Sequence, residues 1–141
     1  KYKRESWIVF TENKKQAKEF NKIINTKGFK SALYNTDLDS AERLENLNKF
    51  KKADLNVLVT CTALDEGFDM PEADGALILS ASSSKRQRVQ RMGRVLRITE
   101  NKPNALIVTV YSSKTEFDKL MEEAKRYHKE GVPVSWKRQD R

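Results

Sequence analysis

The stretch NVLVT, residues 56–60, decides the fold class. Its three central side chains, Val57, Leu58 and Val59, are all apolar, so a strand formed by them is apolar on both faces. A strand of this kind is typical of a parallel sheet that helices cover on both sides. The stretch therefore predicts an α/β protein.

Segments typical of strands and of helices alternate on both sides of this stretch. Further strands are predicted at residues 6–10, 29–34, 76–80 and 104–111. Helices are predicted at about residues 13–27, from a cap at Asp39 or Ser40, from about Ser84, and from Thr115 to about His128. This alternation, with its short connections, predicts an open, mainly parallel sheet with helices on both faces.

Helical spacing predicts which side chains face the core. The three predicted stripes are Ala17, Phe20, Ile23 and Ile24; Leu44, Leu47 and Phe50; and Phe117, Leu120, Met121 and Ala124. Gly28 is expected to end the first helix. Core positions are also expected for Phe10, Phe20, Phe29, Phe50 and Phe117, so no ladder of exposed aromatic rings is predicted for base stacking.

Composition limits the classes of function. The net charge of +8 over 141 residues favours a polyanionic partner such as nucleic acid. No apolar run reaches the ~20 residues of a membrane-spanning helix. One cysteine and one histidine exclude an internal disulfide and an ordinary zinc site, and fit a reducing, intracellular setting. We expect one domain over residues 1–128 and a tail, or the start of a neighbouring segment, over residues 129–141.

Short polar side chains follow the predicted strands. In an open α/β sheet, ligands bind outside the carboxyl ends of the strands, where hydroxyls and main-chain N–H groups suit phosphates. The candidate nucleic-acid contacts at these positions are Thr11, Asn13, Thr60, Cys61 and Thr62. The same side chains could instead cap helices, and both roles can hold at once.

An arginine-rich stretch, VQRMGRVLR at residues 89–97, follows the strand at 76–80. On a helix turning by 100° per residue, Val89, Met92 and Leu96 form an apolar stripe. A separate polar stripe contains Gln90, Arg94 and Arg97, which suits an anion, although a solvated basic helix face has the same pattern. The stretch DEGFDMP, residues 65–71, is a turn whose acids could bind Mg²⁺ or could only stabilise the loop.

Four stretches together resemble the motifs of superfamily 2 helicases and translocases. QRMGRVLR resembles motif VI, VLVTCTALDEGFDMP resembles motif V, WIVFTEN resembles motif IV, and NTDLDSAERLENLNKF resembles the helix between motifs IV and V. They stand in the family's order and cover most of the chain. The chain thus resembles the second, C-terminal RecA-like domain of such a motor, and the resemblance implies a RecA-like fold.

The resemblance also implies roles for individual residues. Arg94 and Arg97 would be arginine fingers that reach the γ-phosphate of ATP, and Gln90 would orient that phosphate, a water molecule or the interface. Gly67 would approach ATP closely with its backbone, and Asp69 would bind the ribose hydroxyls. Where family members usually have Thr or Ser at a phosphate contact, this chain has Cys61, a poor donor, so a neighbouring threonine or N–H group could replace it.

The sequence contains neither a phosphate-binding G-x-x-x-x-G-K-[ST] loop nor an acidic box for magnesium. The resemblance therefore implies that ATP and Mg²⁺ are bound mainly by an N-terminal RecA-like domain of a longer protein, and that this chain alone is inactive. The motif wording favours DNA over RNA as the partner, in the cytoplasm of a bacterium or phage host or in a eukaryotic nucleus. The alternative is a non-catalytic RecA-like scaffold that binds nucleic acid or protein.

Overall fold

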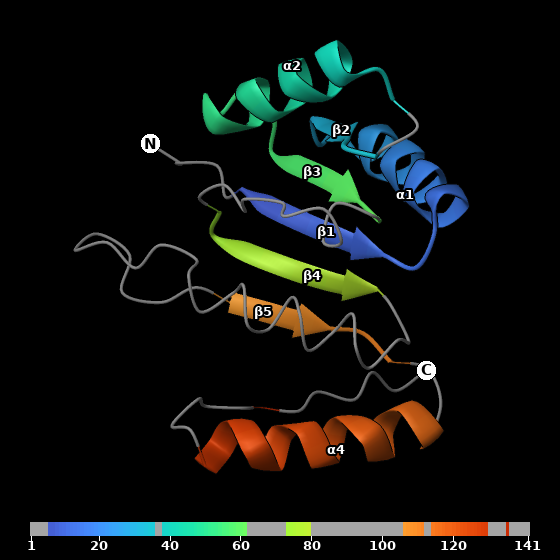
Figure 1. Cartoon of the computed structure of the whole chain (residues 1–141), viewed down its shortest axis with the longest axis vertical. Helices are drawn as coiled ribbons and strands as arrows, with labels where there is room; N and C mark the ends of the chain where they lie inside the picture. The colour runs from blue at the N-terminus through green and yellow to red at the C-terminus, as the bar shows by residue number, and fades with distance from the viewer. Residues whose placement is uncertain are drawn as a thin grey trace, which may run out of the picture. The chain divides into compact units, whose positions relative to one another are not determined.

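The computed structural model describes residues 6–35, 38–61, 73–79, 106–111, 114–129 and 135 (Figure 1). The described strands are β1 (Trp7–Thr11), β2 (Ser31–Leu33), β3 (Val57–Thr60), β4 (Gly75–Leu79) and β5 (Leu106–Thr109). The described helices are α1 (Lys14–Thr26), α2 (Ser40–Lys51) and α4 (Lys114–Lys129). The helix expected from about Ser84 lies outside the described residues.

The five described strands form one parallel sheet in the order β2-β3-β1-β4-β5. Phe10 of β1 pairs with Thr60 of β3 on one side and with Ile78 of β4 on the other. The predicted α/β fold with a parallel sheet is therefore confirmed.

Helices α1 and α2 cover opposite faces of the sheet. Side chains alternate along a strand, and the buried residues accordingly separate into two clusters. On the α2 face, Phe50 and Leu47 pack with Ile8, Phe10, Leu58 and Ile78. On the α1 face, Ala17, Phe20 and Ile24 pack with Val9, Val57 and Val59. Every residue of β3 is buried, as the stretch 56–60 predicts.

Local signals place both ends of α1 where the sequence predicts them. Asn13 is the N-cap, and its side chain accepts a hydrogen bond from the main-chain N–H of Gln16 at 2.8 Å. At the other end Gly28 has a φ of 94°, a left-handed conformation that favours glycine. Phe29 N donates to Ile24 O at 3.2 Å, and Gly28 N donates to Asn25 O at 3.1 Å. This is the Schellman arrangement of a helix C-terminus.

Three expected core side chains are instead exposed, and those expectations were wrong. Ile23 is 55%, Leu44 is 58% and Phe29 is 53% exposed. In each helix the residues that contact the sheet form a narrower stripe than helical periodicity allows, and Ile23 and Leu44 lie outside it. Phe29 is exposed because β2 begins only at Ser31, so Phe29 belongs to the turn after Gly28.

Asparagine side chains close the outer edge of β2, which has β3 on its other side. Ser31 N donates to Asn25 Oδ1 at 3.2 Å, and Asn25 Nδ2 donates to Ser31 O at 3.4 Å. From α2, Asn46 Nδ2 donates to Leu33 O at 2.9 Å. Main-chain groups on a sheet edge otherwise invite pairing with another chain, so these bonds satisfy the edge from within the domain.

The chain divides into two compact units, Lys1–Val110 and Tyr111–Arg141. In the second unit the rings of Tyr111 and Phe117 lie 5.4 Å apart, and Leu120 of α4 is buried. The expected boundary after residue 128 stays a prediction. Within the described residues, no helix is long and apolar enough to cross a membrane.

Candidate functional site

The carboxyl ends of the parallel strands meet at one edge of the sheet. Thr11 ends β1, Thr60 ends β3 and Leu79 ends β4. Register places these ends at nearly one level, because Phe10 pairs with Thr60 and Thr11 pairs with Leu79. We call this the carboxyl edge. Four predicted contact residues, Thr11, Asn13, Thr60 and Cys61, lie at it or directly after it.

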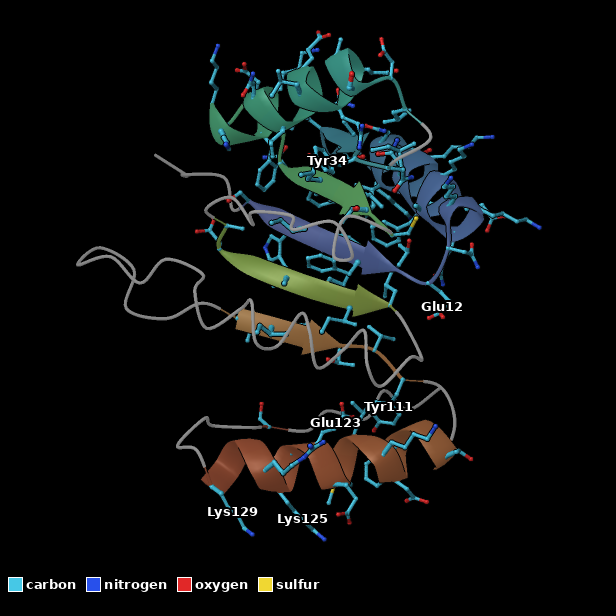
Figure 2. All side chains as sticks on the ribbon, in the orientation of Figure 1. Glu12, Tyr34, Tyr111, Glu123, Lys125 and Lys129 are labelled. Carbon is cyan, nitrogen blue, oxygen red and sulfur yellow. The ribbon has the colours of Figure 1, made fainter. Side chains whose placement is uncertain are left out.

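A set of side-chain hydrogen bonds fixes the turn from β1 into α1. Thr11 Oγ1 donates to Asn13 O at 3.1 Å, and Glu12 N donates to Gln16 Oε1 at 2.7 Å. Together with the Asn13 cap, these bonds resemble a capping box, in which two side chains satisfy N–H groups at a helix start. Figure 2 shows Glu12 at the end of β1, where the chain turns into α1.

Burial separates the predicted contact residues into two groups. Thr11 and Thr60 are completely buried, and Cys61 is 2% exposed, whereas Asn13 is exposed. The side chains of the first group therefore face the protein interior. The first turn of α1 carries the exposed Lys14 and Lys15 and no acidic residue, so its surface is basic.

Asn35 is a site residue that the sequence reasoning missed. It follows β2, is 1% exposed, and its Oδ1 accepts a hydrogen bond from Cys61 N at 3.1 Å. The signal was available, because Asn35 is a short polar residue directly after a predicted strand, like the others. Its Nδ2 and the hydroxyl of Thr60 are buried without a hydrogen-bond partner in the part of the chain that the structure describes.

The remaining predicted site residues lie outside the described residues: Thr62, Gly67, Asp69, Gln90, Arg94 and Arg97. The chain enters residues 62–72 from the carboxyl end of β3 and residues 80–105 from the carboxyl end of β4. Both segments thus begin at the carboxyl edge. No group of three or more His, Cys, Asp or Glu within the described ranges could hold a metal ion.

Comparison with known families gives a match over residues 1–99 to the helicase conserved C-terminal domain. The chain belongs to this family. Its family and its RecA-like fold agree with the resemblance found in the four motifs.

Relatives of this helicase C-terminal domain include a protein named as a DNA translocase. The chain is 36% identical over 114 residues to the "DNA 3'-5' translocase XPB2" of Sulfurisphaera tokodaii, a match covering 81% of this chain and 24% of that protein. It is 32% identical over 100 residues to the UvrABC system protein B of Aliivibrio fischeri, covering 67% of this chain and 15% of that protein. The chain thus spans less than a quarter of the length of these relatives.

The fold of the domain is also that of solved helicase domains. The C-terminal domain of the DEAD-box protein Dbp5 superposes with a TM-score of 0.70 at 20% identity, covering 91% of this chain and 73% of that one. At this identity the likeness concerns the fold alone. It agrees with the five-stranded parallel sheet described above.

Proposed function

We propose that the chain is the second RecA-like half of an ATP-dependent helicase or translocase acting on nucleic acid. ATP then lies at a seam with the N-terminal RecA-like half of the same protein. Arg94 and Arg97 act as arginine fingers on the γ-phosphate, and Gln90 orients that phosphate. Gly67 approaches ATP with its backbone, and Asp69 binds the ribose.

The main support for this proposal is that the two segments with the predicted ATP contacts both begin at the carboxyl edge. The segment with Gly67 and Asp69 follows β3, and the segment with the two arginines follows β4, with only β1 between these strands. In open α/β sheets ligands bind outside this edge. Membership of the helicase C-terminal family supports the same assignment.

Because the threonine hydroxyls are buried, main-chain groups and the start of α1 are the favoured contacts to nucleic acid. Because Thr11 and Thr60 are fully buried and Cys61 N already donates to Asn35 Oδ1, we assign their part of the interface to the main-chain N–H of Thr62 and to the exposed Asn13. Helix starts carry partial positive charge and bind phosphates. Lys14 and Lys15 add to that charge, and the exposed Glu12 reduces it.

The cofactors and the partner follow from the same arrangement. ATP and Mg²⁺ are bound mainly by the other half, since the sequence holds no phosphate loop or acidic box. DNA is favoured over RNA, supported by the printed name of the XPB2 relative. A motor of this kind works inside the cell, in the cytoplasm of a bacterium or phage host or in a eukaryotic nucleus.

Phosphate release tests the proposal. The full-length protein should hydrolyse ATP and be stimulated by single-stranded DNA, whereas this chain alone should not hydrolyse ATP. Robust turnover by the repurified chain would show that it contains a complete site. A full-length protein without stimulated turnover would favour the RecA-like scaffold.

A further inference from the structure

Asn35 joins two strand ends that are far apart in the sequence. The main-chain pairing of β2 with β3 reaches Tyr34, whose N–H donates to Val59 O at 2.7 Å. One residue further on, the Asn35 side chain takes over, and its Oδ1 accepts from Cys61 N, 26 residues away. The side chain thereby holds the backbone of β3 just beyond the last residue of the strand.

The chemistry of Asn35 is unusual for a residue that only fills space. The side chain is 1% exposed, and its Nδ2 has no hydrogen-bond partner in the described residues. An unpaired buried donor is costly, and a leucine of similar size would avoid that cost. Leucine has no acceptor for Cys61 N. The hydrogen bond that Asn35 Oδ1 accepts therefore explains why this position is an asparagine.

We propose that Asn35 is a positioning residue, which fixes the point at Cys61 where the chain leaves the sheet toward residues 62–72. The inference rests on the proposed function, which assigns a nucleic-acid contact to the main chain at Thr62 and ATP contacts to Gly67 and Asp69. Asn35 touches neither ligand. It acts through Cys61 N, and its loss allows the start of the segment to move.

The test compares two variants at Asn35 in the full-length protein. Asn35→Leu removes the acceptor, whereas Asn35→Asp keeps an acceptor of the same shape and replaces the unpaired donor group with a second carboxylate oxygen. The matched control is Asn46→Leu, which also removes a side-chain amide hydrogen bond, the one from Asn46 Nδ2 to Leu33 O of the neighbouring strand β2. The readouts are the single-stranded DNA concentration for half-maximal ATP turnover, kcat, and amide hydrogen exchange at Cys61.

Asn35→Leu should raise the half-maximal DNA concentration about tenfold and change kcat by less than about threefold, because an acceptor for one buried N–H group is lost. Hydrogen exchange at Cys61 should accelerate by a similar factor. Asn35→Asp should stay near the wild type on both measures, even if its thermal stability falls with a buried charge. Asn46→Leu should lower stability without shifting the DNA concentration.

Two results overturn the inference. One is an equal rise in the half-maximal DNA concentration for Asn35→Leu and Asn46→Leu, since the response to DNA would then depend on stability alone. The other is an unchanged half-maximal DNA concentration in Asn35→Leu. That result would leave the proposed function intact and would mean that Asn35 only stabilises the fold. Absence of stimulated turnover in the wild type is a separate failure, because it removes the proposed function and the positioning role together.

Discussion

The ring of Trp7 lies directly over Gly75, its partner in the pairing of β1 with β4. A Cβ atom placed on Gly75 would come within 2.5 Å of two ring atoms of Trp7. The close approach is a packing requirement, and it explains why β4 begins with a residue that has no side chain.

Gly75→Ala should therefore destabilise the domain by about 1–3 kcal/mol, the usual range for overpacking. The measurement is urea unfolding followed by far-ultraviolet circular dichroism, which does not depend on Trp7. The double variant Trp7→Leu/Gly75→Ala should lose less stability than the two single changes added together, because the smaller side chain relieves the clash. If the losses of stability in the two single variants simply added up in the double variant, a direct contact between Trp7 and residue 75 would not be the cause.

The side chain of Asn25 closes the outer edge of β2 through two bonds to Ser31. Asn25→Ala should lower the free energy of unfolding by about 0.5–1.5 kcal/mol, since a helix-favouring alanine cannot replace these bonds. Asn48→Ala, at an exposed position of α2, gains the same helix propensity and should lose no stability. Equal effects in the two variants would mean that the edge bonds do not stabilise the sheet.

The basic first turn of α1 should contribute to binding single-stranded DNA. Binding by this chain should be weak and indifferent to base sequence. Its affinity should fall as salt rises, and a plot of log affinity against log salt concentration should have a slope of about −0.7 per neutralised phosphate. Lys14→Gln/Lys15→Gln should weaken binding about threefold to tenfold and flatten the slope. Fluorescence titrations at two salt concentrations measure both quantities.

The control for this prediction removes the same charge at the opposite edge of the sheet. Lys51 is the last residue of α2 and Lys52 is its C-cap, on the connection that leads to the amino end of β3, and both are exposed. Lys51→Gln/Lys52→Gln should change DNA affinity less than about twofold. If the two double variants weaken binding equally, the net charge of the chain governs binding, and the start of α1 is not a specific contact.

Local sequence signals predicted much of the fold. The cap at Asn13, the left-handed glycine at 28 and the apolar run 57–59 each act through neighbouring residues, so the sequence contains the relevant physics. The exposure of Ile23 and Leu44 depends on how wide a stripe each helix presents to the sheet, which helical periodicity does not fix. Phe29 was misplaced because the start of β2 depends on its pairing with β3.

The candidate site was predictable to a lesser degree. Strand-end reasoning located Thr11, Thr60 and Cys61 at the carboxyl edge, but not the burial of their side chains. The bond from Cys61 N to Asn35 joins residues 26 positions apart, and no local pattern reports such a contact. The roles of Arg94 and Arg97 stay predictions, because they lie outside the described residues.

The most direct test of the central claim is ATP turnover by arginine variants of the full-length protein. Arg94→Ala and Arg97→Ala should each lower kcat by more than about 100-fold, because arginine fingers contribute about 10³–10⁵-fold in related phosphoryl transfers. Affinity for DNA and thermal stability should change little. Arg88→Ala is the matched control, because helical spacing predicts that Arg88 lies off the polar stripe, and it should stay within about threefold of the wild type. If Arg88→Ala proves as damaging as Arg94→Ala, the arginines act as a diffuse basic patch, and the assignment of fingers is wrong.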